Sequence, residues 1–420
     1  MSTHTQVLIV GAGLGGLLAA NKLSDHGKSV RILEAAAESG GRARSLSAAD
    51  ATLNLGAHAL YLGGPLATLL DELDAMPDGL DPVKRRGARG AGRYQQETHF
   101  IPTTPMQMLT SSLLSWRGKR DITKFFAGAM SKKPLPSSWS TTDWLDNFDL
   151  APDARAMAEG FMRLSTYSAD LDIFRADVAK KMLYRAVRHG VLYLHGGWGA
   201  MIAALERRAI TRGADLLHEA RAQKLVRLED GTFAIETPRG RFTSDFVILA
   251  TPPRVAARLL EEEAEDWNLV AARAACLDLV MRGPLDVPDF VQGFDEPTYF
   301  AVHSRTARLT REQSHEIVHV ARYIRRDEKP ERSQVEATMD GLLEGWRERE
   351  VFARYGASPV VHGIPVVGAE RPSRRPWPNV FLVGDWLRGD EHLSDGVADS
   401  ANEATEEILS RITSPERAAG

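Results

Sequence analysis

The stretch VLIVGAGLGG at residues 7–16 decides the fold of this 420-residue chain. Its first four residues are all apolar, which is typical of a short buried strand. The glycines that follow have the spacing of a phosphate-binding turn: Gly11 permits the turn, Gly13 lets the backbone approach a pyrophosphate, and Gly16 lets helix and strand pack closely. The helix that Leu14 opens then presents its positive end to the anion.

The residues after this turn complete a strand-helix-strand unit. Apolar residues recur at helical spacing over 14–26, and Gly27 ends the helix. Residues 30–33 form a second apolar strand, which is parallel to the first because a helix crosses between them. Glu34 follows, where its carboxylate is placed to accept hydrogen bonds from ribose hydroxyls and to disfavour a 2′-phosphate. The unit therefore predicts a Rossmann-like site for NAD or FAD.

The composition is that of an ordinary globular protein, with 43% hydrophobic and 26% charged residues. A net charge of -4 lacks the basic excess that nucleic acids attract, so we expect no nucleic-acid partner. The single cysteine, Cys276, excludes a disulfide framework and favours a reducing compartment. Residues 1–6 lack signal-peptide features, and no window reaches about 18 apolar residues. We expect a cytoplasmic protein.

The residues after Glu34 distinguish FAD from NAD. Gly40-Gly41-Arg42 completes a Glu-x5-Gly-Gly-Arg arrangement, which resembles the FAD signature of the amine oxidase and phytoene desaturase superfamily. The resemblance implies FAD as cofactor, with this second turn lying along its pyrophosphate and ribityl part. By residue type, the two glycines admit the cofactor, and Arg42 offers a charge-assisted bond to a phosphate or an ordered carboxylate.

Three distant segments resemble the same superfamily. Residues 221–225 resemble the strand whose backbone pairs with adenine, with Ala222 as the contact, and residues 247–253 resemble the passage out of the FAD domain. Residues 380–386 and 395–401 resemble its last strand and helix. This resemblance implies that Asp385 bonds the ribityl chain and that the helix start at Val397 directs N–H groups at the flavin. A positive helix end there stabilises negative charge on the reduced flavin.

These patterns predict an α/β protein in which a Rossmann-like (GR2-type) FAD-binding domain is interleaved with an α+β substrate domain. The pattern is mostly helical from 77 to 190, strands return at 216–250 and 276–326, and helices are expected over 334–350 and 397–412. We assign residues 1–76, 190–256 and 376–414 to the FAD-binding domain, 77–189 and 257–375 to the substrate domain, and 415–420 to a flexible tail.

The resemblance places the cofactor contacts on the glycine-rich turns, after the second strand and at the last strand-to-helix passage. The expected FAD contacts are Gly11, Gly13, Leu14, Gly15, Gly16, Glu34, Ala35, Gly40, Gly41, Arg42, Gly56, Ala57, Ala222, Gly384, Asp385, Gly396 and Val397.

The candidate catalytic residues are His58 and Tyr61, in the segment that superfamily members place against the flavin. His58 is able to shuttle a proton near neutral pH. The alternative is that His58 packs on its turn and only orders the backbone. Gly196 and Gly197 resemble the superfamily's aromatic-Gly-Gly stretch and suggest close backbone approach to the cofactor.

Three classes of function remain open. The first is a dehydrogenase, desaturase or oxidase that transfers a hydride from an apolar, isoprenoid or polyene substrate to FAD. The second is an amine or amino-acid oxidase that releases hydrogen peroxide. The third is a redox-neutral isomerase or a non-catalytic FAD-binding protein. The helical region shows no carboxylate clamp and residues 276–305 hold no lysine, which favours the first class.

Two further partners follow from the pattern. No second GxGxxG follows a strand, so we expect no internal NADPH site and an acceptor such as oxygen or a quinone. Residues 106–130 mix apolar side chains with Arg117, Lys119, Arg120 and Lys124, which fits peripheral contact with a membrane. A solvated helix face is the alternative.

One sequence motif resembles a zinc-binding motif, but we expect it to bind no metal. Residues 315–319 spell H-E-x-x-H, whose zinc chemistry needs His315 and His319 on one helical face. The β-branched residues around them favour a strand, in which positions four apart lie about 13 Å from each other. We therefore expect no metal site.

Overall fold

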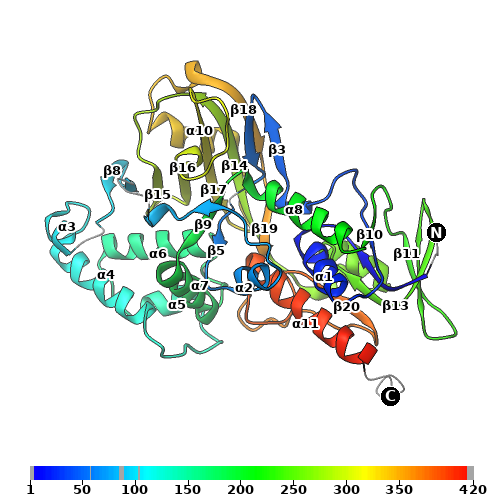
Figure 1. Ribbon diagram of the computed structural model, residues 1–420. Helices are drawn as coiled ribbons and strands as arrows, with labels where there is room; N and C mark the ends of the chain where they lie inside the picture. The colour runs from blue at the N-terminus through cyan, green and yellow to red at the C-terminus, as the bar shows by residue number, and fades with distance from the viewer. Residues whose placement is uncertain (1–3, 57, 85–88, 103–104, 414–420) are drawn as a thin grey trace.

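The computed structural model describes residues 4–56, 58–84, 89–102 and 105–413. The expected contact Ala57 and the predicted tail at 415–420 lie outside these residues. Two large sheets, two small sheets and a group of helices make up the described part of the molecule (Figure 1). The predicted α/β fold is confirmed, and the expected strand-helix-strand unit stands at its centre.

The first sheet has the strand order β10-β2-β1-β13-β12-β11, with β20 paired to β13. Strands β10, β2, β1, β13 and β20 run parallel, and β12 and β11 add an antiparallel hairpin. Their bounds are β1 His4–Val10, β2 Val30–Leu33, β10 Asp215–Leu217, β11 Lys224–Arg227, β12 Phe233–Thr237, β13 Gly240–Leu249 and β20 Val380–Leu382.

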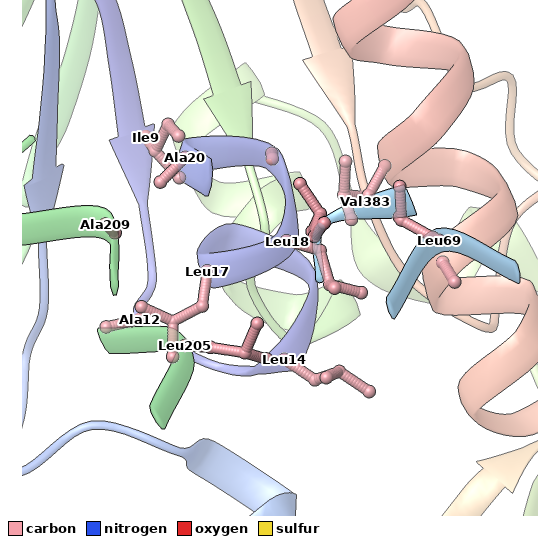
Figure 2. Packing of buried hydrophobic residues seen from close by; sticks show 14 of the residues in the cluster. Ile9, Ala12, Leu14, Leu17, Leu18, Ala20, Leu69, Leu205, Ala209 and Val383 are labelled. Carbon is pink, nitrogen blue, oxygen red and sulfur yellow. The ribbon is translucent and has the colours of Figure 1, made fainter. Parts of the chain in front are cut away.

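Helices cover the first sheet because its central strands are apolar on both faces. One face packs against α1, α2, α8 and α11, and α9 lies on the other. Figure 2 shows Leu18 of α1 lying toward Leu69 and Val383, and Leu14 lying toward Leu205. The bounds are α1 Leu14–Asp25, α2 Pro65–Glu72, α8 Gly197–Thr211, α9 Pro253–Leu260 and α11 Leu393–Thr413.

The second sheet has the order β18-β14-β17-β16-β15-β7-β8, with β19 paired to β14. Helix α10 packs on its outer face, and its inner face packs with Tyr61 of β5 in the other half of the molecule. The bounds are β5 Leu60–Tyr61, β7 Gly90–Tyr94, β8 Glu97–Phe100, β14 Ala271–Arg282, β15 Phe290–Gly293, β16 Thr298–Val302, β17 His315–Ile324, β18 Glu350–Gly356, β19 Val360–Gly363 and α10 Arg332–Asp340.

The remaining helices share an apolar core beside the second sheet. Two small sheets lie between the halves, one of β3 and β4 and one in which β9 pairs with β5 and β6. The bounds are α3 Pro105–Thr110, α4 Trp116–Ala129, α5 Thr141–Asp146, α6 Pro152–Thr166, α7 Ala176–His189, β3 Ser45–Ala48, β4 Ala51–Asn54, β6 Gly79–Leu80 and β9 Val191–Leu194.

Three expected elements differ from the structure. The helix predicted over 334–350 ends at Asp340, because Gly341 follows it, and the chain then turns at Gly345 into strand β18. The region 77–190, predicted as mostly helical, also holds β6, β7 and β8. The last helix begins at Leu393, four residues before its expected start. This difference changes which residues form its first turn in the site described below.

Candidate active site

The first glycine-rich turn shows why each glycine is needed. Gly11 has φ +102°, and a Cβ atom on it would lie 2.4 Å from the Ala250 carbonyl oxygen. A Cβ on Gly16 would lie 1.9 Å from the Gly11 carbonyl oxygen. At Gly13 the nearest atom to a Cβ is 3.9 Å away. Protein packing therefore demands the first two glycines, whereas the open space at Gly13 suits close approach of a ligand.

The rest of α1's first turn is packed against the last strand and helix. A Cβ on Gly15 would lie 2.5 Å from Val383 Cγ1 and 2.9 Å from Val397 Cγ1. Leu14 is buried in the core around α1. The structure thus brings Leu14 and Gly15 together with Val397, as part of the scaffold below the turn.

The Glu34 carboxylate holds this turn directly. Its Oε2 accepts the Ala12 N–H at 2.7 Å, and its Oε1 accepts the Ala36 N–H at 2.8 Å. Each carboxylate oxygen keeps a further acceptor position, so these bonds are compatible with the proposed ribose contacts. Ala35, another proposed contact, is exposed beside it.

The second glycine-rich turn lies against the first. The Gly40 N–H donates to the Ala12 carbonyl at 2.8 Å, and Gly13 pairs with Gly40 as an isolated parallel bridge. Gly40 and Gly41 have φ values of +120° and +54°. The two turns that the sequence proposed for one cofactor are therefore neighbours.

The Arg42 guanidinium contacts an ordered carboxylate, the second of the two partners expected for it. It forms an ion pair with buried Asp385, and its Nη1 donates to the Val361 carbonyl at 2.8 Å. Burial raises the pKa of Asp385, but the Arg42 charge outweighs this effect and holds that pKa below its usual value. Arg371 donates to the Asp385 carbonyl at 3.0 Å and so holds the loop after Gly384.

The start of α11 corrects one expectation. Val397 was expected to open this helix, but the Gly396 N–H already donates to the His392 carbonyl at 3.0 Å. The N–H groups of the first turn therefore belong to residues before Gly396. Leu393 there has φ +54°, a conformation that costs a non-glycine residue energy and that often marks functional sites.

The first residues of α8 contact another part of the protein. Asn54 Oδ1 accepts the Trp198 N–H at 3.0 Å, and Ser45 Oγ accepts the Gly199 N–H at 2.9 Å. A Cβ on Gly197 would lie 2.7 Å from Asn54 Oδ1. The close approach at Gly197 is therefore to the β3-β4 hairpin, whose side chains cap α8.

The two candidate catalytic residues are held by backbone groups. His58 Nδ1 lies 2.9 Å from the Gly56 carbonyl oxygen, and its Nε2 lies 3.1 Å from that of Arg42. Burial lowers the pKa of His58. The Tyr61 hydroxyl donates to the Ser165 carbonyl at 3.1 Å, and burial raises its pKa, so it stays protonated. This geometry suits the alternative in which His58 orders its turn, and catalysis by either residue remains a proposal.

The adenine-side residue Ala222 is buried just before β11, and Arg258 donates to its carbonyl at 3.0 Å. Gly56 has φ +135° and precedes His58.

Sequence reasoning missed the polar groups of the inner face. His319 Nδ1 lies 2.6 Å from Asp278 Oδ1, and the His303 ring stacks on that of His319 with centroids 5.2 Å apart. Asp278 and His319 are buried and have apolar residues on either side of them in their strands. A polar residue between apolar neighbours was the signal available in the sequence. In the sequence, His319 attracted attention only as the second histidine of the H-E-x-x-H motif. The structure places this motif in strand β17, which confirms that it is not helical.

A sequence profile described as flavin containing amine oxidoreductase matches residues 14–276. The chain belongs to this family. The family's name gives a flavin as its cofactor, which agrees with the two glycine-rich turns. Among curated relatives, protoporphyrinogen oxidase 2 of Arabidopsis thaliana is 32% identical over 121 residues, which are 28% of this chain and 23% of that protein. The match therefore spans about a quarter of the relative's length.

Solved structures with this fold cover nearly the whole chain. An oxidoreductase from Methanosarcina mazei is 20% identical with a TM-score of 0.76, over 96% of this chain and 100% of that one. A putrescine oxidase variant is 16% identical with a TM-score of 0.75, over 97% and 99%. At these identities the likeness establishes the fold.

Two expected absences concern only the described part of the chain. There, no group of histidine, cysteine, aspartate and glutamate side chains has the arrangement of a metal site. Nor does any helix among those residues have the length and apolar character needed to span a bilayer.

Proposed function

We propose that this protein oxidises an apolar small molecule by transferring a hydride to FAD, which then passes its electrons to oxygen or a quinone. The relatives are named for two substrate classes, a porphyrinogen and a diamine. The chemistry of the inner face favours an apolar substrate over an amine. Its buried cluster consists of alanines, one cysteine and tyrosines: Tyr61, Tyr167, Ala274, Cys276, Tyr299, Ala301, Ala321 and Tyr323.

The tyrosines of this cluster support the proposal because they stay neutral. Burial raises the pKa values of Tyr61, Tyr167 and Tyr299, so their hydroxyls are uncharged at physiological pH. The Tyr193 and Tyr299 hydroxyls lie 3.1 Å apart and bond each other. These hydroxyls offer weak acceptors to a substrate, and the Asp278 carboxylate on the same face already pairs with His319 and Arg354.

The proposed cofactor site uses the residues placed above. The turns at Gly13 and Gly40 face the pyrophosphate, Glu34 the ribose, and the Arg42-Asp385 pair the ribityl chain. FAD supplies the hydride acceptor, and the chain supplies position, charge and exclusion of water. We propose that His58, which its lowered pKa keeps neutral, takes up the proton.

Anaerobic reduction of the purified holoprotein tests this function. We expect the flavin absorbance near about 450 nm to bleach with an apolar, reduced polyene, terpenoid or porphyrinogen, and not with primary or secondary amines. Bleaching by amines alone, with peroxide released in air, would assign the protein to the amine oxidase alternative. Bleaching by neither panel, in protein that binds FAD, would favour the redox-neutral class.

We also propose that the edge formed by β8, α3 and α4 contacts an anionic membrane surface. Three of its large apolar side chains are exposed: Phe100 by 62%, Met106 by 68% and Trp116 by 74%. Lys119 lies over the Trp116 ring, and Lys124 is exposed on the same helix. Aromatic side chains beside lysines suit the region between lipid headgroups and acyl chains.

A further inference from the structure

Two hollows adjoin each other where helix α7 meets the segment before α11. The outer hollow is open and has a volume of about 670 Å³. The inner hollow has a volume of about 10 Å³, close to the least space that a single water molecule needs. Lys181, Asp390 and Glu391 line both hollows, so the inner one lies directly behind the outer one.

The inner hollow reaches the buried tyrosine-containing cluster of the inner face. Tyr61 lines the hollow and is a member of that cluster. Leu393 also lines the hollow and packs against the same cluster. Val178 and Met182 add two buried apolar side chains from α7. A small molecule in this hollow would therefore contact the segment around Tyr61, which is proposed to meet the flavin.

Four charged side chains form an ion-pair chain from the outer hollow to the inner one: Lys181, Glu391, Arg185 and Asp395. Lys181 Nζ lies 2.7 Å from Glu391 Oε1, and Arg185 donates to both Glu391 oxygens, at 2.8 and 3.1 Å. Arg185 Nη1 also donates to Asp395 Oδ2 at 2.7 Å. The exposed fraction falls from 41% for the Lys181 side chain to 14% for Glu391 and 5% for Asp395. The ion-pair chain thus leads from solvent into the protein interior.

This ion-pair chain closes the route in a way that side-chain motion can reverse. Ion pairs near the surface contribute only about 0–1 kcal/mol, so the Lys181–Glu391 pair opens easily. Glu391 is the shared partner of Lys181 and Arg185, so loss of its charge releases both. Between Glu391 and Asp395 the backbone passes through Leu393 at φ +54°, which costs about 1–3 kcal/mol and favours rearrangement of this segment.

A buried hydrogen-bond donor belongs to the wall of the inner hollow. His392 lines it, and burial holds the pKa of this histidine well below its usual value, so the ring is neutral. Arg371 Nη1 donates to His392 Nδ1 at 3.3 Å, which places the ring proton on Nε2. His392 Nε2 is shielded from solvent and has no hydrogen-bond partner among the described residues. A buried donor without an acceptor is costly, so a small acceptor beside His392 would be stabilised.

We propose that the ion-pair chain is the gate of a passage through which dioxygen reaches the reduced flavin. The inner hollow has room for a molecule of the size of water or dioxygen, but not for the ring of a quinone. Dioxygen takes two electrons and two protons from the dihydroflavin, which returns to its oxidised form, and leaves as hydrogen peroxide. The peroxide oxygens can accept the His392 Nε2–H on the way out. The use by dioxygen rests on the proposed function, whereas the passage itself requires neither flavin nor turnover.

Thiol labelling of the purified holoprotein tests the gate without turnover. Cys276 is the only cysteine of the chain, so Cys276→Ala gives a background without thiols. Met182→Cys then places one thiol in the wall of the inner hollow. We expect the small neutral reagent methyl methanethiosulfonate to label this thiol at least tenfold faster in Glu391→Gln, because Lys181 and Arg185 have lost the charge that they share.

Two controls separate gating from other effects. Glu403→Gln removes an acid of the outer hollow that pairs with Arg374 and lies outside the ion-pair chain, so the labelling rate at Met182→Cys should stay unchanged. Val335→Cys, in the same Cys276→Ala background, places a thiol in the core beneath α10, on the outer face of the second sheet. Labelling at this position reports general unfolding, and Glu391→Gln should not accelerate it.

Reoxidation of the flavin tests what the passage carries. The holoprotein is photoreduced with EDTA, so no substrate is needed, and is then mixed with dioxygen in a stopped-flow instrument. Val178→Phe fills the inner hollow and should slow reoxidation at least fivefold, and Val178→Leu should slow it less. Val187→Phe is the control, because Val187 is 55% exposed on the same helix. Glu391→Gln should accelerate reoxidation at least twofold.

Other results would overturn the gate or its use by dioxygen. Equal labelling rates in Glu391→Gln and Glu403→Gln would show that the ion pairs only join α7 to the segment before α11. Equal acceleration at Val335→Cys would assign the labelling to unfolding. Equal reoxidation rates in Val178→Phe and Val187→Phe would show that dioxygen takes another route. If all these rates change as expected but no apolar substrate reduces the flavin, the passage stands and the proposed function is contradicted.

Discussion

Arg42 and Asp385 lie 343 positions apart in the chain and form one ion pair where the second glycine-rich turn meets the last strand of the first sheet. The Arg42 side chain is 51% exposed and the Asp385 side chain 2% exposed, so the carboxylate depends on its partner more than the guanidinium does. The same carboxylate accepts the Gly363 N–H at 3.3 Å. One buried acid thus joins both ends of the proposed cofactor site to the second sheet.

Removing Arg42 should therefore weaken both the fold and the cofactor site. In Arg42→Ala, Asp385 becomes a buried charge without its main partner, and we expect a loss of about 1–3 kcal/mol in the free energy of unfolding. FAD affinity should fall at least tenfold. Urea unfolding and FAD titration of the apoprotein measure the two effects. Arg44→Ala is the control, because Arg44 is exposed and bonds the Gly41 carbonyl. Equal behaviour of the two variants would contradict a role for the pair.

Substitution of two glycines in the first turn should have different effects, one on stability and the other on FAD affinity. Gly16→Ala places a Cβ atom against the Gly11 carbonyl, so the apoprotein should lose about 1–3 kcal/mol of stability. Gly13→Ala has room in the protein and a φ of −76°, so the apoprotein should melt as before. Its FAD affinity should nevertheless drop at least tenfold, because the methyl group occupies the space proposed for the pyrophosphate. An apoprotein melting temperature that falls equally in both variants would refute this division.

The first half of the fold was predictable because its signals are local. The turn, the helix and Glu34 lie within about 30 residues, and the structure joins Glu34 to Ala12 by a hydrogen bond. For Arg42, only the chemical class of its partner was predictable from the sequence. An ordered carboxylate was one of its two expected partners, but nothing near Arg42 in the chain identifies Asp385.

The inner face was not predictable because it depends on strand register. Asp278 and His319 meet only when β14 and β17 pair with those two residues opposite each other. A shift of one position in either strand would turn that strand's side chain to the outer face and so separate the two residues. The helix expected at 334–350 failed for a local reason, since its apolar spacing continues across Gly341, at which the backbone leaves the helix.

Asp395 should make stability depend on pH in an unusual direction. Burial raises its pKa to about 6, against the bonds it accepts from Arg185 at 2.7 Å and from the Leu66 N–H at 3.0 Å. A carboxyl whose pKa is higher in the folded state stabilises that state below its unfolded pKa, and this contribution is lost as pH rises through about 6.

Asp395→Asn keeps a neutral acceptor for Leu66 and removes this titration. The melting temperature of the unchanged protein, relative to the variant, should therefore fall between pH 4 and 7 by the equivalent of about 1–3 kcal/mol. Differential scanning calorimetry across this range measures it. Asp399→Asn is the control, since Asp399 lies on the same helix and is more exposed. A difference that stays constant with pH would show that Asp395 titrates at its ordinary pKa.

The exposed edge of β8, α3 and α4 should bind vesicles through Trp116 and Phe100. Replacing both with serine removes two large apolar side chains that would enter the interface, each contributing about 1.5–3 kcal/mol when fully buried. We expect at least a tenfold loss of binding to vesicles of phosphatidylglycerol and phosphatidylcholine in a co-sedimentation assay. Ile210→Ser is the matched control, because Ile210 is exposed by 49% on α8, away from this edge. The unchanged protein should bind less to pure phosphatidylcholine, because that bilayer has no net negative surface charge to attract Lys119 and Lys124. Equal retention of the double variant and the control would show that this edge is a solvated surface.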